Sequence, residues 1–294
     1  MREVTTIAEV RRLLDDQRRA GRAIGFVPTM GYLHAGHLSL VERAAAECDV
    51  VLASIFVNPL QFAPNEDLDA YPRDLDRDRG LARRAGVDVL FVPTTVEMYP
   101  EPVATTVSVS GVSERLDGAS RPGHFDGVAT VVAKLFNLSG PCRAYFGEKD
   151  FQQLAVVRRM VSDLSIPVEV VACPTVREDD GLAMSSRNAY LDLDQRAAAP
   201  VLNRALRAGA ALIEGGVVHA DEVRAAMQEV VAAEPLAELD YVEVADPAVL
   251  EPIGPLGPFA GRPVRLLGAI RLGSTRLIDN LGAEVPEGVG DAAG

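Results

Sequence analysis

Two periodicities alternate through the first 176 residues. Apolar residues recur at helical spacing in four stretches, at residues 7–14, 36–47, 127–138 and 151–164. Short β-rich runs lie between them, at residues 23–27, 51–58, 88–93, 143–147 and 167–174. Strands that alternate with helices form βαβ units, whose crossovers cover both faces of a parallel sheet. The pattern therefore predicts an α/β fold with a Rossmann-like, doubly wound parallel sheet.

The pattern changes after Val176. Residues 177–188 form a polar stretch without periodicity, and two Ala-rich helical stretches follow at 194–214 and 220–233. Two further β-like runs lie at 239–246 and 264–273. We therefore expect a first domain over residues 1–176 and a smaller α+β domain over residues 177–294. The tail from about Ala283 is rich in Gly, Pro and acidic residues, which predicts disorder.

The composition of the chain indicates the cellular compartment of the protein. The chain has no apolar run of about 18 residues, the length that a transmembrane helix requires. Its N-terminus lacks the apolar core and the small-residue cleavage site of a signal peptide. Cys48, Cys142 and Cys173 are odd in number and lack metal-ligand spacing, as expected for reduced thiols. These features predict a cytoplasmic protein that does not associate with a membrane.

The net charge narrows the range of partners. A formal charge of −13 argues against nucleic-acid binding, which depends on a basic face. A small anionic substrate remains possible, since a few local cations can outweigh a distant acidic surface. Lysine occurs only at Lys134 and Lys149, whereas arginine supplies the other 27 of the 29 cations. Each lysine therefore has either a specific role or the ordinary role of a surface charge.

The loop after the first strand carries the first candidate chemistry. The chain lacks a Walker motif, and no G-x-G-x-x-G follows this strand, which disfavours P-loop NTPases and the usual dinucleotide enzymes. Instead, His34 and His37 lie three residues apart at a loop-to-helix junction, on one side of the first turn. Such a pair can hydrogen-bond a polyphosphate and stabilise charge on a leaving group. Helix capping is the alternative for this pair.

Two further segments carry polar groups suited to a nucleotide. Gly147-Glu148-Lys149-Asp150 follows a strand and opens a helix, at the sheet edge where open α/β folds bind ligands. Lys149 could reach a phosphate, and Asp150 could accept hydrogen bonds from ribose hydroxyls. Met184-Ser185-Ser186-Arg187-Asn188 offers two hydroxyls and a guanidinium in a loop, an inventory suited to closing over phosphates. By itself, the first segment also fits an exposed helix start with an acidic cap, and the second also fits a polar linker.

Together these three segments resemble the H-x-G-H adenylyl-transferring superfamily. Six strings, in order from about residue 24 to residue 280, resemble the pantothenate synthetase family: PTMGYLHAGHLSL, FVNPLQF, YPRDL, GEKDFQQL, TVREDDGLAMSSRN and GSTRLIDN. The resemblance covers nearly the whole chain, and six ordered strings make it highly specific. Tyr32 and Ala35 depart mildly from the commonest family pattern.

The resemblance implies ATP-dependent condensation of pantoate with β-alanine through a pantoyl adenylate, with Mg²⁺ accompanying ATP, in a homodimer. It implies that the smaller domain is a lid over a first domain that binds ATP and pantoate. His34, His37 and Lys149 are the implied catalytic residues, and these three also bind ATP. The other implied ATP contacts are Met30, Gly147, Asp150, Val176, Met184, Ser185, Ser186 and Arg187. The implied pantoate contacts are Gln61 and Gln153, with Asn58 and Arg121 of second rank. The sequence assigns no metal ligand, although acidic residues such as Asp76 and Asp78 lie in an Arg/Asp-rich helix.

Three other functions have to be weighed against this one. A nucleotidylyltransferase of the same fold would need a cationic pocket for a phosphate acceptor, where the chain has FVNPLQF with two neutral amides. An aminoacyl-tRNA synthetase fragment is disfavoured by the acidic charge and by the absence of a tRNA-binding extension. A non-catalytic nucleotide-binding regulator would not need an intact set of histidines, Lys149 and the Ser-Ser-Arg loop. Fold alone excludes none of these.

Overall fold

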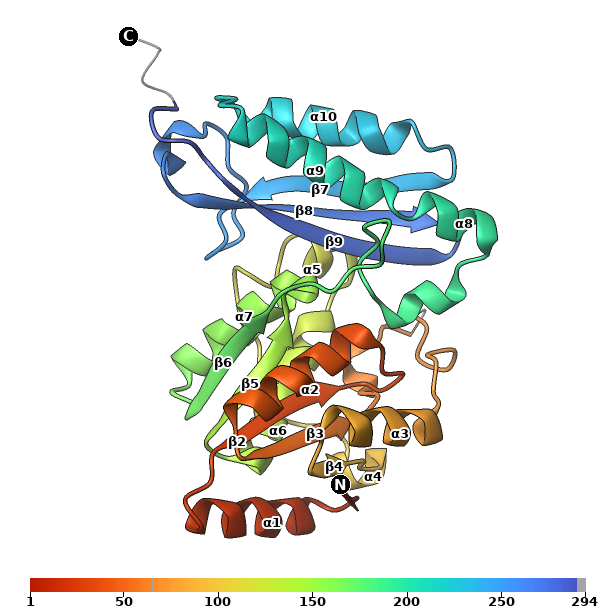
Figure 1. Cartoon of the computed structure of the whole chain (residues 1–294), viewed down its shortest axis with the longest axis vertical. Helices are drawn as coiled ribbons and strands as arrows, with labels where there is room; N and C mark the ends of the chain where they lie inside the picture. Colours follow the sequence, from red (N-terminus) through yellow and green to blue (C-terminus); the bar gives the residue numbers. More distant parts are fainter. Residues whose placement is uncertain (65, 290–294) are drawn as a thin grey trace. The chain divides into compact units, whose positions relative to one another are not determined.

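The computed structural model describes residues 1–64 and 66–289 (Figure 1). It divides into two compact units, of which the first comprises Met1–Thr175 and the second begins at Val176. This division falls one residue before the boundary that the sequence predicts. No helix in the described part of the chain is long and apolar enough to cross a membrane.

The first unit contains a six-stranded sheet in which every neighbouring pair of strands is parallel. Its order is β1-β4-β3-β2-β5-β6. The strands are β1 (Arg2–Val4), β2 (Ile24–Thr29), β3 (Val50–Ile55), β4 (Val89–Phe91), β5 (Cys142–Gly147) and β6 (Val168–Cys173). The predicted α/β sheet is confirmed. The short strand β1 was not predicted, because three residues are too few to show an alternating pattern.

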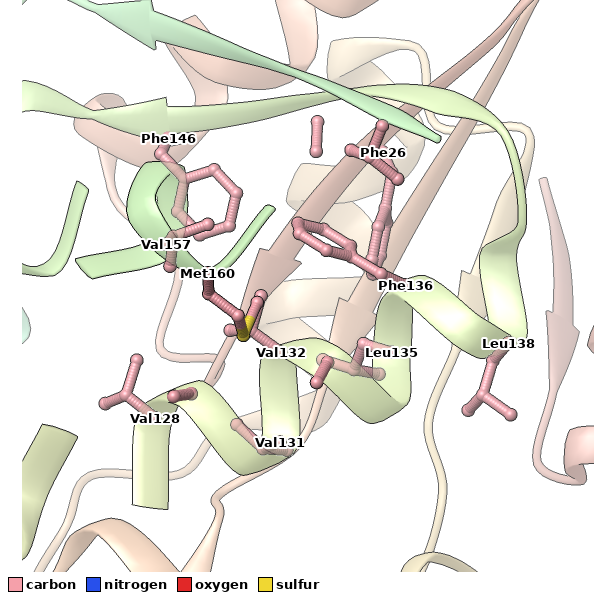
Figure 2. Close-up of a cluster of buried hydrophobic side chains, with 14 of the residues drawn as sticks. Phe26, Val128, Val131, Val132, Leu135, Phe136, Leu138, Phe146, Val157 and Met160 are labelled. Atoms are coloured by element: carbon pink, nitrogen blue, oxygen red, sulfur yellow. The ribbon is translucent and has the colours of Figure 1, made fainter. Parts of the chain in front are cut away.

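Helices cover both faces of this sheet, as the doubly wound prediction requires. They are α1 (Ile7–Arg19), α2 (Ala35–Glu47), α3 (Leu75–Ala85), α4 (Thr95–Met98), α5 (Asp117–Ser120), α6 (His124–Ser139) and α7 (Phe151–Asp163), with 3₁₀ turns η1 (Pro59–Gln61) and η2 (Glu148–Asp150). Helices α1, α6 and α7 bury one face, where Phe26, Phe136 and Phe146 pack edge to face (Figure 2). Helices α2 and α3 bury the other face, against alternate strand residues such as Val27 and Val51.

The second unit is a three-stranded antiparallel sheet with helices packed against it. The strands are β7 (Ala237–Ala245), β8 (Pro263–Leu272) and β9 (Thr275–Glu284), in the order β7-β8-β9. Its other elements are η3 (Ser186–Tyr190), α8 (Leu193–Ala198), α9 (Val201–Glu214), α10 (Ala220–Ala232) and η4 (Gly257–Phe259). The predicted helix at 194–214 is two helices, which meet at Pro200. Proline has no N–H with which to continue the helical hydrogen bonds.

The prediction of a disordered tail from Ala283 is wrong for residues 283–289. Strand β9 continues to Glu284, and Ala283 pairs with Val264 of β8. Val285 and Val289 are buried in the apolar core of the second unit. Two buried valines offset the polar composition of the segment, which alone indicated disorder. Residues 290–294 lie outside the described part of the chain.

Candidate active site

The loops after β2, β3 and β5 leave the parallel sheet at its carboxyl edge, where ligands bind in open α/β folds. The loop after β2 leads into α2, with His34 as the residue that precedes the helix and His37 in its first turn. The His34 N–H donates to His37 Nδ1 over 3.4 Å, and the two ring centroids lie 4.1 Å apart. Because His37 Nδ1 accepts, a neutral His37 carries its proton on Nε2, which is then a hydrogen-bond donor.

Burial keeps both imidazoles neutral at pH 7. It lowers the pKa of His34 to about 4, and the charges of Lys149 and Arg77 lower it further while Asp150 opposes them. Burial also lowers the pKa of His37 to about 3, with His34 and Lys149 as further causes and Asp150 again opposed. The charges of Lys149 and Asp150 thus act in opposite directions on the pKa of both histidines. His34 Nδ1 is buried and has no hydrogen-bond partner among the described residues.

The loop that carries the histidines depends on Asp78, which the sequence left without a role. The Asp78 carboxylate, on α3, accepts hydrogen bonds from the backbone N–H groups of Tyr32 and Leu33, each over 2.7 Å. Gly31 and Tyr32 have positive φ angles of 88° and 49°, so the loop makes a tight left-handed bend there. Burial raises the Asp78 pKa, and the two backbone hydrogen bonds oppose that rise. Asp78 therefore fixes the bend that precedes His34.

The segment after β3 brings together three predicted residues. Asn58 is buried with 1% exposure, and its Nδ2 donates to Gln61 Oε1 over 3.1 Å. Gln61 Nε2 in turn donates to the sulfur of Met30 over 3.1 Å. Met30 belongs to the histidine loop, so this contact joins the ends of β2 and β3. The predicted ATP contact Met30 and the predicted pantoate contact Gln61 are therefore neighbours.

Arg121, a predicted substrate contact of second rank, lies beside the backbone of Gln61. Its guanidinium forms a bidentate ion pair with Glu66, with distances of 2.6 and 2.7 Å, and donates to the Gln61 carbonyl over 3.3 Å. The Gln61 carbonyl also accepts from His124 Nδ1 over 2.9 Å, while His124 Nε2 lies 3.1 Å from Arg121 and accepts from it. Burial and Arg121 lower the His124 pKa to about 4. A direct contact of Arg121 with substrate stays a prediction.

The turn after β5 carries the next predicted group. Gly147 precedes η2, and the Lys149 ammonium lies 3.2 Å from the Asp150 carboxylate. The Lys149 side chain is 19% exposed, against 47% for Asp150, so this cation is largely enclosed. Gln153 is half-buried in the first turn of α7. These residues and the histidines follow neighbouring strands, since β5 pairs with β2.

The remaining predicted ATP contacts lie in the second unit. Met184 N–H donates to the Val176 carbonyl over 3.0 Å, and the Ser185 hydroxyl accepts from Arg187 N–H over 3.3 Å. Ser186 begins η3 and is buried. The loop before them is anchored by a bidentate ion pair of Arg177 with Asp279, at 2.7 and 2.9 Å. This pair links the TVREDDGLAMSSRN string to the late GSTRLIDN string.

The fold and the strings match one family. A family model described as pantoate-beta-alanine ligase matches residues 2–282. The chain belongs to the pantoate–β-alanine ligase family. The curated pantothenate synthetase of Sinorhizobium medicae (strain WSM419) is 56% identical over 280 residues, which cover 95% of each chain. That of Brucella anthropi is 55% identical over 95% of this chain and 96% of the relative.

Solved structures agree with this membership. The pantothenate synthetase of Thermus thermophilus superposes with a TM-score of 0.90 and 55% identity, over 97% of this chain and all of the other. The pantoate-β-alanine ligase of Francisella tularensis, complexed with β-γ ATP and β-alanine, superposes with a TM-score of 0.77 and 33% identity, over 96% and 97%. The α/β fold predicted from the alternating patterns and the family predicted from the six strings are therefore both confirmed, and the chain is an enzyme of that family.

Proposed function

We propose that this enzyme forms pantothenate in two steps, in which ATP first activates pantoate as an acyl adenylate and β-alanine then displaces AMP. The pantothenate-forming reaction is that of its family. The observation that carries the two-step route is the buried, neutral His34–His37 pair at the N-terminus of α2, close to Lys149. A regulator that only bound nucleotide would not need this pair together with Lys149 and the Ser-Ser-Arg loop.

In the first step, a pantoate carboxylate oxygen attacks the α-phosphorus and pyrophosphate leaves. Negative charge builds on the leaving group, and groups that meet it without rearranging stabilise the transition state. His37 Nε2–H, His34, the N-terminus of α2 and the Lys149 ammonium supply such groups. Because the His37 pKa is about 3, a neutral donor role is favoured over transfer of a proton.

In the second step, the amine of β-alanine attacks the acyl carbon, and the C–O bond to AMP breaks. Neither step needs an enzyme nucleophile, so positioning supplies much of the rate. Gln61 and Gln153 bind pantoate through neutral amides, which donate and accept without changing the local charge. Their placement after β3 and β5, on either side of β2, supports this role.

The second unit would provide the phosphate-closing loop, with Ser185, Ser186 and Arg187 as its contacts. The Arg177–Asp279 ion pair supports this role, because it anchors the start of the loop to strand β9 of the same unit. We assign Mg²⁺ to the phosphates of ATP, as part of the substrate. Mg²⁺ usually keeps several waters and needs few protein ligands, and the described residues include no group of three or more acidic, His or Cys side chains suited to a metal. The proposal also includes a cytoplasmic location, which the composition of the chain favours, and a homodimer, which the family resemblance implies.

The decisive test is pyrophosphate release from Mg-ATP with pantoate alone, followed by AMP release when β-alanine is added. Pantoate-dependent pyrophosphate and β-alanine-dependent AMP are expected. Pyrophosphate that requires a phosphorylated acceptor would identify a nucleotidylyltransferase instead. Binding of ATP by folded protein without any pyrophosphate would identify a nucleotide-binding regulator.

A further inference from the structure

Tyr99 and Lys134 have no part in the proposed reaction, yet their contacts lead to Gln61. Tyr99 directly follows α4, and its ring lies under the Lys134 ammonium, 5.3 Å from nitrogen to ring centroid. The same ammonium donates to the carbonyl of Met98. A cation over an aromatic face and a hydrogen bond to the preceding residue both restrain the ring. Lys134 is one of only two lysines in the chain.

The Tyr99 hydroxyl donates to Asn58 Oδ1 over 2.9 Å. The same oxygen accepts from Leu60 N–H over 3.3 Å, and Asn58 Nδ2 donates to Gln61 Oε1 and to the Gly127 carbonyl, each over 3.1 Å. The amide of Asn58 is therefore fully used, with two hydrogen bonds accepted and two donated. Reversing this amide would place its NH₂ group against the Leu60 N–H and its oxygen against the Gly127 carbonyl, so these two backbone groups set its orientation. The Tyr99 hydroxyl adds a hydrogen bond that holds the amide in this place.

The orientation of the Asn58 amide determines whether Gln61 offers a donor or an acceptor to a substrate. Because Gln61 Oε1 already accepts from Asn58, the NH₂ group of Gln61 is directed the other way, toward the sulfur of Met30. A thioether sulfur is a weak acceptor. A substrate oxygen would therefore compete well for this NH₂ group. With the opposite orientation, Gln61 would offer an acceptor, which repels a carboxylate.

The backbone around Gln61 is fixed separately, by close packing on α6. A Cβ added at Gly127 would lie 2.2 Å from the Leu60 carbonyl oxygen and 2.6 Å from Gln61 N. Only glycine allows η1 to approach the helix this closely. Lys134 follows Gly127 by two helical turns on the same helix. Helix α6 thus supports both the backbone of Gln61 and the ring of Tyr99.

We propose that Tyr99 is a positioning residue which, through Asn58, holds Gln61 as a hydrogen-bond donor toward the carboxylate or hydroxyl oxygens of pantoate, with Lys134 restraining the Tyr99 ring. This inference rests on the proposed binding of pantoate by Gln61. It makes Tyr99 a determinant of pantoate recognition at a distance from the substrate.

Steady-state kinetics of Tyr99→Phe, Gln61→Ala and the double variant test this inference. Tyr99→Phe should raise the KM for pantoate about five- to tenfold, the usual effect of one lost hydrogen bond, with kcat and the KM for ATP within about twofold. In the Gln61→Ala background, Tyr99→Phe should add nothing, since its effect passes through Gln61. An unchanged KM for pantoate in Tyr99→Phe, or effects that multiply in the double variant, would overturn the proposal.

Two further variants keep the result interpretable. Tyr145→Phe removes another hydroxyl of the first unit, one that donates to Glu47 over 2.9 Å, and should leave the KM for pantoate unchanged. If Tyr99→Phe does not fold, Lys134→Met leaves the hydroxyl in place and should still raise that KM, about twofold. An unchanged KM for Lys134→Met removes the lysine from the proposal. A normal KM for pantoate in Gln61→Ala would instead refute the proposed role of Gln61 itself.

Discussion

The loops after β2 and β3 lie at the ends of paired strands, yet they use their polar groups in opposite ways. In the histidine loop, burial keeps two imidazoles neutral, and His34 Nδ1 has no partner among the described residues. In the segment after β3, Asn58 uses its whole amide and Gln61 is oriented by it. The histidine loop is therefore suited to binding a charged ligand group. The segment after β3 instead presents neutral amide groups in one fixed orientation. Changes in the first should therefore affect kcat, and changes in the second should affect the KM for pantoate.

The largest effect should come from His37→Ala. Removing one preorganised donor to a developing negative charge typically lowers kcat by about 10²–10³-fold. We expect a loss of this size in pantoate-dependent pyrophosphate release, with little change in the KM for pantoate. His219→Ala, which removes an exposed histidine of the second unit, is the matched control. Near-normal pyrophosphate release by folded His37→Ala would remove the histidine from the mechanism.

The buried histidines should also make the first unit sensitive to acid. His34 and His124 have a pKa of about 4 and His37 of about 3, all below the ordinary value of 6.5. Below pH 6.5 these histidines therefore bind protons in the unfolded chain but not in the folded chain. The stability from these groups is complete above pH 6.5 and is lost as the pH falls toward 4 and then 3.

For one histidine, the limiting slope is about 1.4 kcal/mol per pH unit, or tenfold in the unfolding equilibrium. Urea midpoints measured at pH 7 and pH 5 should fall with acid in the parent protein. His34→Gln should reduce the difference between the two midpoints, whereas the control His219→Gln should not. An identical pH response in His34→Gln would show that His34 is protonated as easily in the folded state as in the unfolded chain.

Asp78→Asn should loosen the loop that carries the histidines. An amide in place of the carboxylate offers one accepting oxygen and one donor, so one of the two N–H groups of Tyr32 and Leu33 loses its partner. We expect a loss of about 1–3 kcal/mol in stability and about a tenfold lower kcat. Asp76→Asn, on the same helix but with a side chain 93% exposed, is the matched control. Equal effects of the two variants would contradict a role specific to the loop.

The positions of residues that belong to short strings at strand ends could be predicted from the sequence, and the partners of residues that act across the fold could not. His34 and His37 follow strand β2 and Lys149 follows its neighbour β5, so their placement at one edge of the sheet follows from parallel pairing. Asn58 and Gln61 share one string. Asp78, Glu66 and Tyr99 lie far along the chain from the groups that they hold, and no periodicity marks their partners. The prediction of a disordered tail from Ala283 failed for a related reason. Composition does not show that Val285 and Val289 are buried in the core of the second unit.

The smallest expected effect, that of Glu66→Gln on the KM for pantoate, distinguishes two roles for Arg121. If Arg121 binds substrate directly, neutralising its partner with Glu66→Gln should leave the KM for pantoate unchanged or lower it, because the guanidinium becomes more available. If Arg121 instead holds the backbone of Gln61, the loss of its bidentate partner should free it to move and raise that KM about threefold. We expect the rise, since the Gln61 carbonyl accepts from both Arg121 and His124. Glu97→Gln, another partly exposed acid of the first unit whose carboxylate accepts from Ile7 N–H, is the control and should not change the KM. A lowered KM in Glu66→Gln would place Arg121 with the charged groups of the histidine loop, and would move the boundary between the two regions.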